Sequence, residues 1–544
     1  SSDAIMKNKS TTMYGNIVAL DESPLQEDLI YVGTDDGLIQ VSENAGDTWM
    51  KYEDFKGIPA FTYVNSLVTS QHNINRVYAV FNNHKRGDFA PYILVSNDKG
   101  KTWKSIVSNL PIRGSVYDIV EDHKDENLLF VGTEFGVYFS YDGGKEWKQL
   151  KNGLPTIAVR DLEIQKREND LDLATFGRSF YVLDDYSALR FLKEKINKKA
   201  HIFPIKKSLM YIDSRPLGLR GKGSQGESYF TAKNPPIGAV INYIFNDSLK
   251  TQKEIRQSNE KKKIKSKLDI QYPTIEDLKY EDNEEKPYLI FTILDENGKE
   301  IRKIIEKPKL GYNSIVWNFR LTPQNNISLK SSSPGRYSEA NNGPLALPGK
   351  YFVTMHKVQN GITTMMVDKT PFECEWLNQL STPTDNKIAR LSFQLKVDQI
   401  RKAIDASSEV LKEDKKRLEF IKSAFKSYPN LDLKYLSKLR QLDSIRKEIR
   451  IKLYGDESLS KRDIEQKESI SSKVGIIIWN MWRNRSNPTI TNKNLYESAS
   501  NSFEKLIVEI QNLESSIKEI EKYLESREVP FTPGRGLILN WKNE

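Results

Sequence analysis

The stretch Ser96-Asn97-Asp98-Lys99-Gly100-Lys101-Thr102-Trp103 decides the fold of this chain, because its pattern occurs three times near the N-terminus. The other two copies are Ser42-Glu43-Asn44-Ala45-Gly46-Asp47-Thr48-Trp49 and Ser140-Tyr141-Asp142-Gly143-Gly144-Lys145-Glu146-Trp147. The three tryptophans are 54 and 44 residues apart. That spacing is about the length of one four-stranded propeller blade. The repeat therefore predicts consecutive blades of a β-propeller.

Each copy has the residues that a tight turn between two strands requires. The Ser and Asp side chains can accept hydrogen bonds from backbone N–H groups of the turn. The Gly supplies a positive φ, and the Trp packs its ring into the blade edge. The pattern resembles the Asp-box (BNR) turn of sialidase-like and sortilin-like propellers. We interpret the following residues as structural rather than catalytic: Ser42, Asn44, Gly46, Trp49, Ser96, Asp98, Gly100, Trp103, Ser140, Asp142, Gly144 and Trp147.

Composition narrows the classes of function. The 544 residues carry a formal net charge of +9, and the lysines are spread among glutamates rather than gathered in one patch. A nucleic-acid partner is therefore not expected. The single cysteine, Cys374, excludes an intrachain disulfide. No apolar run is long enough to span a membrane. Because the chain opens with Ser1 rather than Met, we expect a processed or truncated piece.

Residues 1–195 are predicted to form four blades. Their innermost strands align on one apolar position, which is occupied by Ile17, Leu67, Ile119 and Leu162. The fourth blade has no turn motif of the kind described above. Propellers close by pairing the first and last blades, and Asp-box propellers are larger rings. We therefore expect the missing blades as a partner, supplied by the rest of the same protein or by a separate chain.

A wider resemblance extends over nearly the whole chain. The stretches 132–137, 183–185, 234–240 and 529–535 are similar to large bacterial secreted proteins labelled BNR-repeat, sortilin-like or "glycosyl hydrolase". The fourth-blade motif of that family usually reads Thr-His-Gly-Arg, and here Phe176 stands at the His position. Any chemistry that depends on that His is in doubt for this chain. The resemblance implies a secreted, periplasmic or cell-surface location in a Gram-negative-type bacterium.

Two further domains are predicted after a linker at 196–226. Residues 227–375 resemble a FlgD-like Ig-type β-sandwich, interrupted by a charged helical insertion at 248–285. Strands are expected at 239–245, 288–294, 299–306, 314–319, 350–358 and 363–367. The Glu296-Asn297-Gly298 stretch is a hairpin turn signal. Thr274 is expected to begin a helix within the insertion.

From 385 to 527 the apolar period becomes helical, with a tail at 528–544. Helices are expected at 387–427 and 433–453, ended by Pro429 and Gly455. A seam with steps of three and four residues follows: Phe503, Leu506, Ile510, Leu513, Ile517, Ile520 and Leu524. The seam predicts either an antiparallel bundle within the chain or an oligomeric coiled coil. The intrachain bundle is favoured.

The central channel of the propeller is the best candidate for a ligand site. The residues just before the shared apolar position, with their neighbours, are Asn16, Asn65, Ser66, Tyr117, Asp118, Arg160 and Asp161. Asp118 and Asp161 on neighbouring blades, with Arg160 and Tyr117, could bind sugar hydroxyls, a basic peptide or a metal. The two carboxylates could also serve as a glycosidase pair. The simpler interpretation is a solvated polar funnel or a link between blades. No metal or cofactor is expected, since the five histidines lack metal-ligand spacing.

The predicted fold class is a multidomain β and α protein with a partial Asp-box propeller, an Ig-like sandwich and a helical bundle. The leading functional hypothesis is a binding or scaffold protein whose propeller face holds a peptide, a glycan or an envelope protein. The alternative is a glycoside hydrolase that uses a carboxylate pair in the channel. An assembly factor with the helices as a docking arm is a third. A close carboxylate pair with one raised pKa would favour the enzyme.

Overall fold

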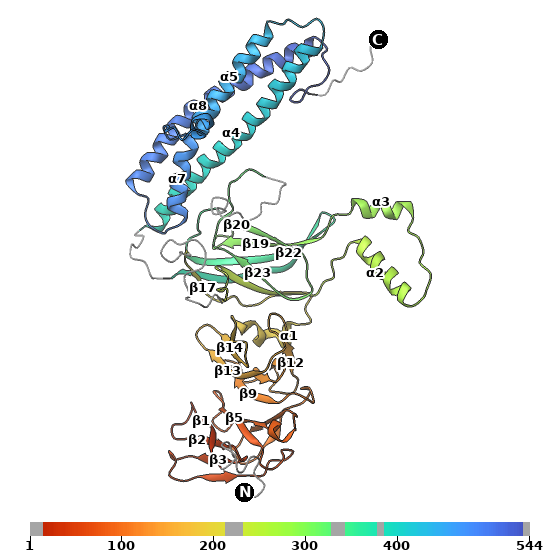
Figure 1. The fold of residues 1–544 in the computed structure, drawn as a ribbon, viewed down its shortest axis with the longest axis vertical. Coiled ribbons are helices and arrows are strands. Elements are labelled where there is room, and N and C mark those ends of the chain that lie inside the picture. The colour runs from red at the N-terminus through yellow and green to blue at the C-terminus, as the bar shows by residue number, and fades with distance from the viewer. Residues whose placement is uncertain (1–14, 213–231, 328–342, 378–385, 537–544) are drawn as a thin grey trace. The chain divides into compact units, whose positions relative to one another are not determined.

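A computed structural model describes residues 15–212, 232–327, 343–377 and 386–536. The chain divides into two compact units (Figure 1). The first unit is built mainly from residues 1–204, and the second holds most of the remaining chain.

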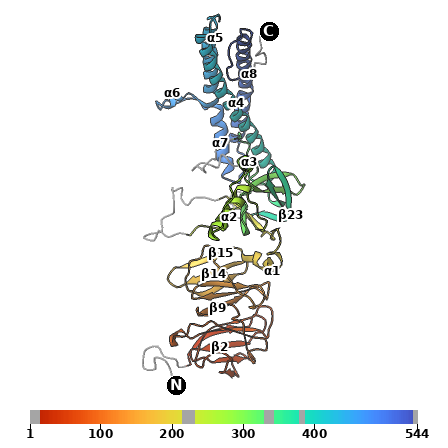
Figure 2. The ribbon, with the colours of Figure 1, turned by 90° about the vertical axis from the view of Figure 1, so that its right-hand side faces the viewer.

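The first unit contains four antiparallel sheets in chain order (Figure 2). Each strand is hydrogen-bonded to the strand that precedes it in the same sheet. The first sheet is β1 (Ile17–Glu22), β2 (Ile30–Thr34), β3 (Ile39–Ser42) and β4 (Met50–Tyr52); the second is β5 (Tyr63–Thr69), β6 (Val77–Asn82), β7 (Tyr92–Ser96) and β8 (Lys104–Ser105); the third is β9 (Val116–Glu121), β10 (Leu129–Thr133), β11 (Gly136–Ser140) and β12 (Lys148–Leu150); the fourth is β13 (Val159–Gln165), β14 (Asp170–Thr175) and β15 (Phe180–Leu183).

Successive side chains along these strands point to opposite faces of the sheet. The apolar side chains of neighbouring sheets pack together into a shared core. One core joins the first and second sheets and contains Tyr31 and Phe81. Another joins the second and third sheets around Val80 and Ile119. The third core joins the third and fourth sheets. This face-to-face succession of small sheets is the packing of propeller blades.

The repeated motif forms the same turn in all three copies. The Gly100 N–H donates to Ser96 Oγ at 2.8 Å, and the Thr102 N–H donates to Asp98 Oδ1 at 2.8 Å. The corresponding bonds in the first and third copies are 2.8 to 3.0 Å long. Gly100 has a φ of +85°, as the sequence predicted. Asn44 and Glu146 leave this bonding unchanged.

The motif tryptophans are not equivalent, which corrects the expectation that each ring is buried in a blade edge. Trp147 is 3% exposed, and its indole N–H donates to the Ile106 carbonyl at 2.8 Å. Trp103 packs against the core between the first two sheets. Trp49 is 41% exposed. The difference follows from position: Trp103 and Trp147 lie against the preceding sheet, whereas Trp49 comes just before β4 of the first described sheet.

A short helical stretch follows the last strand of the fourth sheet. It consists of η2 (Tyr186–Phe191) and α1 (Leu192–Lys195). Arg190 donates two hydrogen bonds to the buried Asp122 carboxylate at 2.7 and 2.8 Å, and Tyr186 Oη donates a third at 2.6 Å. These bonds link the stretch to the third sheet and lower the pKa of Asp122 against the opposing effect of its burial.

Two more sheets follow. The strands are β16 (Ala200–Ile202), β17 (Ser208–Met210), β18 (Ala239–Phe245), β19 (Tyr288–Asp295), β20 (Glu300–Glu306), β21 (Gly311–Trp317), β22 (Gly349–Gln359) and β23 (Ile362–Trp376). Their orders are β16-β18-β21 and β17-β23-β22-β19-β20. Short strands β16 and β17 lie in the stretch expected to be a linker. β21 begins earlier than expected. β23 is longer than expected, because it pairs with β22 from Ile362 to Cys374, with register shifts at Met355. An Ig-like topology remains a prediction.

The charged insertion contains two helices, α2 (Gln252–Lys265) and α3 (Ile275–Asn283). Each begins with a capping box, in which Thr251 and Thr274 accept from the backbone N–H groups of Glu254 and Asp277. Neither helix has a buried residue. Arg256 connects them through paired bonds to Glu281, both 2.7 Å long.

The C-terminal region is a helical bundle (Figure 1). Its helices are α4 (Lys387–Ser427), α5 (Tyr435–Tyr454), α6 (Glu457–Ser460), α7 (Ile470–Trp482) and α8 (Ile490–Ser526). All seven seam residues of α8 are buried against apolar residues of α4, α5 and α7. The intrachain alternative is therefore the one found. Helix α7 was not among the predicted helices.

No helix in the described part of the chain is long and apolar enough to cross a membrane. Cys374 is 3% exposed, and burial raises the pKa of its thiol to about 12. The antiparallel sheets and the helical C-terminal region agree with the predicted fold class. The number of blades in a closed ring remains a prediction.

Candidate functional site

The predicted channel residues lie on or beside the first strand of each of the four sheets. The structure brings together those of the second, third and fourth sheets. Ser66 Oγ on β5 donates to Asp118 Oδ1 on β9 at 2.7 Å, and the Asn65 amide donates to the Tyr117 carbonyl. Asn16 belongs to a different cluster, since its side-chain amide donates to Asp35 Oδ2 at 2.8 Å.

Asp118 is the most perturbed of the predicted residues. Asp118 is 8% exposed, and its carboxyl group accepts from the Leu162 N–H at 2.9 Å in addition to Ser66. Burial raises the pKa of Asp118 to about 7, and the nearby Asp161 carboxylate raises it further against the lowering effect of these hydrogen bonds. Such a carboxyl group is about half protonated at neutral pH.

Asp118 and Asp161 form a close pair. Both accept from the same Leu162 N–H, at 2.9 Å to Asp118 Oδ2 and 3.1 Å to Asp161 Oδ1. The two distances together set an upper limit of about 6 Å between these oxygens, while retaining glycosidases hold their carboxyl groups about 5–5.5 Å apart. Asp161 is exposed, unlike Asp118. The pair therefore has one desolvated member and one solvent-facing member.

A cationic and aromatic platform adjoins the pair. The Arg160 guanidinium lies 3.8 Å from the centroid of the Tyr117 ring and 5.2 Å from that of Phe176. The Tyr117 hydroxyl donates to the Glu134 carboxylate. Burial, followed by this hydrogen bond, raises the pKa of Tyr117 to about 12. Phe176 is 69% exposed, so its ring offers an open face beside Arg160.

Three residues of this cluster were missed as site candidates. Glu134 lies in the β10–β11 hairpin, and Phe176 follows β14. His84 begins the short helix η1 (His84–Arg86), and burial together with Arg160 and Lys85 lowers its pKa. The position of Phe176 in the fourth-blade motif was the available sequence signal. Nothing local in the sequence connects Glu134 or His84 to Arg160, because the contacts are made between sheets.

Among the described residues, no group of three or more His, Cys, Asp or Glu side chains is arranged to hold a metal ion.

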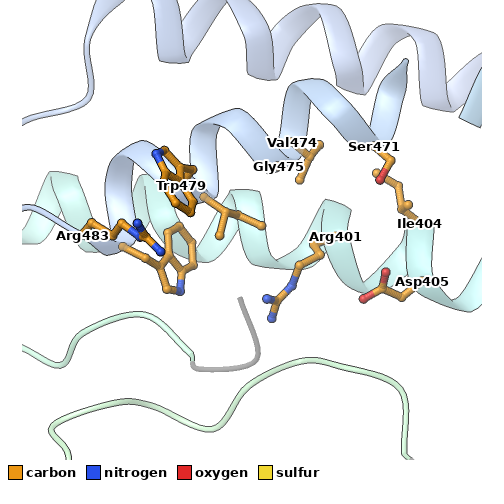
Figure 3. Close-up of a pocket in the computed structure, with 10 residues that line it drawn as sticks. Arg401, Ile404, Asp405, Ser471, Val474, Gly475, Trp479 and Arg483 are labelled. Atoms are coloured by element: carbon orange, nitrogen blue, oxygen red, sulfur yellow. The ribbon is translucent and has the colours of Figure 1, made fainter. Parts of the chain in front are cut away.

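A cavity of about 380 Å³ lies in the helical bundle between α4 and α7 (Figure 3). Arg401 and Asp405 project from α4, and the Arg483 guanidinium stacks on Trp479 with 3.2 Å to the ring centroid. Gly475, which has no side chain, lines the cavity next to Val474. Burial raises the pKa of Asp405. This cavity was not predicted, because α7 itself was not.

Comparison with known proteins finds weak similarity to glycoside hydrolases. No family model matches the chain. Xyloglucanase Xgh74A of Acetivibrio thermocellus is 29% identical over 140 residues, which cover 23% of this chain and 16% of that protein. A xyloglucanase of a Paenibacillus species is 29% identical over 139 residues, covering 23% of this chain and 13% of that protein. The chain thus spans no more than about one-sixth of the length of these relatives.

Solved structures give partial matches. YCF48 from Cyanidioschyzon merolae aligns with a TM-score of 0.25 at 16% identity, covering 31% of this chain and 53% of that one. The GH74 xyloglucanase from Xanthomonas campestris aligns with a TM-score of 0.25 at 14% identity, covering 32% of this chain and 30% of that one. The sequence relatives and the carboxylate pair are the basis of the functional proposal.

Proposed function

We propose that the four sheets belong to a secreted glycoside hydrolase of propeller type that acts on a polysaccharide, with xyloglucan as the first substrate to test. The observation that carries this proposal is the Asp118–Asp161 pair, in which two carboxyl groups share one N–H and only one is desolvated. The similarity to xyloglucanases supports it and favours the enzyme over a scaffold.

The pair has the asymmetry that glycoside hydrolysis requires. Asp118, with a pKa of about 7, is the general acid. It gives its proton to the glycosidic oxygen as the bond from that oxygen to the anomeric carbon breaks. The exposed Asp161 carboxylate attacks the anomeric carbon and forms a glycosyl-enzyme. Water then displaces Asp161 and returns a proton to Asp118.

The neighbouring platform supplies the sugar contacts in this proposal. The open face of Phe176 offers an apolar surface for a pyranose ring. Arg160 provides guanidinium N–H donors for sugar hydroxyls, and its stacking on Tyr117 fixes its position. Partly exposed Glu134 can accept from another hydroxyl.

A second candidate function is glycan or peptide binding without cleavage. Both oxygens of Asp118 already accept hydrogen bonds, and the residue is only 8% exposed. A group held in this way links three sheets, which is the structural role considered for it from the sequence. Under this alternative Arg160, Asp161 and Phe176 are the binding residues.

Further propeller sheets are proposed as the partner of this unit. Ile17 and Leu20 on β1 are 63% and 67% exposed, and Phe180 and Val182 on β15 are 75% and 54% exposed. These apolar side chains lie on the first and last of the four sheets. Additional blades, from the same protein or from another chain, would cover them and complete the channel.

Turnover of polysaccharides separates the two functions. Release of reducing ends from xyloglucan and from unbranched β-glucans is measured for the wild type and for D118N, D161N and D54N, where Asp54 is an exposed control. We expect D118N and D161N to lose at least about a hundredfold of the rate and D54N to lose nothing. Proton NMR of the first product should show retained anomeric configuration.

The remaining outcomes are equally distinct. Binding of xyloglucan by the wild type without release of reducing ends, lost in D161N, establishes the binding function instead. Inversion at the anomeric carbon refutes the role of Asp161 as nucleophile. Absence of both binding and turnover in a complete propeller refutes both candidates.

A further inference from the structure

Two buried arginines and a half-buried third lie at the place where the helical bundle meets the end of the five-stranded sheet. Arg390, in the first turn of α4, is 1% exposed, and Arg485, three residues after α7, is 7% exposed. Arg320, which follows β21, belongs to the same group, since Arg320 and Arg485 both lower the pKa of Arg390. The second unit thus holds three guanidinium groups close together.

The described surroundings of Arg390 and Arg485 supply carbonyl oxygens and a ring rather than carboxylates. Arg390 Nη1 donates to the Asn484 carbonyl at 3.3 Å. Arg485 donates to the carbonyls of Leu377 and Met210 at 3.0 and 3.4 Å. Both guanidinium groups lie over the Trp376 ring, 5.4 and 4.6 Å from its centroid. Within the described ranges, neither arginine forms an ion pair with Asp or Glu.

One edge of Arg390 has buried donors without an acceptor. Its Nε and Nη2 atoms are inaccessible to solvent and make no hydrogen bond to the described residues, and the same holds for Trp376 Nε1. Nε and Nη2 form the side of a guanidinium that presents two parallel N–H groups, which match two oxygens of one oxyanion. A buried charge without a counter-ion, with its N–H groups unsatisfied, is strongly unfavourable.

We propose that this junction is a binding site for one small oxyanion, held by the Nε–Nη2 edge of Arg390 with Trp376 Nε1 and the neighbouring Arg485. All the unsatisfied groups of Arg390 and Trp376 are donors, so the ligand must offer acceptors. Because Arg390 is almost fully enclosed, the ligand is a free anion such as phosphate, sulfate or a short carboxylate rather than a side chain of a partner protein.

The bound anion has a structural consequence in this proposal. Arg390 and Arg485 come from the helical bundle, whereas Trp376 ends β23. The anion therefore bridges the bundle and the sheet and offsets the mutual repulsion of the arginines. Burial, together with Arg320 and Arg485, lowers the pKa of Arg390 to about 10 without it, which agrees with a site that lacks negative charge.

Direct binding to the full-length chain is the first test. Equilibrium dialysis with radiolabelled phosphate, and separately with sulfate and acetate at constant ionic strength, should show one saturable site per chain for at least one of them. Ion chromatography of the desalted, acid-denatured protein identifies an anion that was retained during purification. If dialysis shows no saturable site and chromatography finds no retained anion, the proposal is overturned. This outcome does not depend on whether any variant folds.

Variants then assign the site. The thermal unfolding temperature is measured against the concentration of the bound anion for the wild type, R390Q and R440Q, in which Arg440 is an exposed arginine of α5. A general salt effect raises the unfolding temperature of all three proteins equally. The proposal requires an additional, saturable rise in the wild type and R440Q that R390Q lacks. An equal rise of the unfolding temperature in all three proteins would mean that the anion binds elsewhere, and it would overturn the proposal.

Discussion

At the residue scale, Asp118 shows how a single carboxyl group connects the sheets and gives the site its chemistry. Ser66 and the Leu162 N–H hold it from the sheets on either side. The same contacts enclose it and raise its pKa to about 7 by desolvation. A group that is needed for packing is thereby made a proton donor near neutral pH.

This elevated pKa predicts how stability depends on pH. Because the folded pKa of about 7 exceeds the unfolded value of about 3.9, the folded state binds the proton more tightly. Asp118 therefore contributes stability that is fully present below about pH 4 and is lost as pH rises towards 7. The loss amounts to at most about 4 kcal/mol.

Urea unfolding of the wild type, D118N and D54N at pH 5 and pH 8 measures this effect. The change in unfolding free energy between the two pH values should be smaller in D118N than in the other two proteins. The same pH dependence in all three proteins would show that Asp118 is ionised throughout. That result would also remove it as the general acid.

At the element scale, α7 and α8 show the limits of reading local patterns. The seam of α8 has a regular apolar period and was predicted correctly. Helix α7 is short, and the apolar run 474–479 at its centre includes Ile476 and Trp479 beside the buried positions, which obscures the helical period in the sequence. Its packing against α4 and α8 reveals the helix. The cavity beside Trp479 and the arginine junction depend on α7, and so both escaped prediction.

The seam also gives a stability prediction. Ile517 on α8 is fully buried, whereas Val508 on the same helix is 55% exposed. I517A should lower the unfolding free energy of the bundle by about 2–5 kcal/mol through lost burial and a residual cavity. V508A should change it by less than about 0.5 kcal/mol.

Circular dichroism at 222 nm during urea unfolding reports these differences. Because the seam packs within the chain, the midpoint of helical unfolding should not depend on protein concentration in a variant that carries threonine at the exposed apolar positions 17, 20, 180 and 182 of the sheets. A midpoint that rises with concentration, or equal effects of the two substitutions, would favour the oligomeric coiled coil instead.

At the scale of the whole molecule, the sequence predicted sheets and turns far better than the site. Ser96 and Asp98 bond groups only a few residues away, and so their spacing alone revealed the turn. Arg160, Tyr117 and Glu134 meet because consecutive sheets pack face to face, which no local pattern records. Asn16 was grouped with the channel by alignment, but its contact with Asp35 lies within its own sheet region.

The exposed apolar side chains on β1 and β15 predict how the chain behaves alone. With Ile17, Leu20, Phe180 and Val182 uncovered, the 62.7 kDa chain should self-associate, and replacing all four by threonine should reduce that association. Sedimentation velocity over a range of concentrations measures this. A wild type that sediments as a stable monomer would show that these sheets need no further blades.

The single buried thiol described above has a practical consequence for such experiments. Cys374 is almost fully enclosed and is protonated at any pH used for maleimide coupling, because its pKa is raised to about 12. The folded natural chain should therefore not react with thiol reagents. Cysteines introduced at exposed positions on each unit can carry a donor and an acceptor dye without removal of the native residue, and so the distance between the units becomes directly measurable.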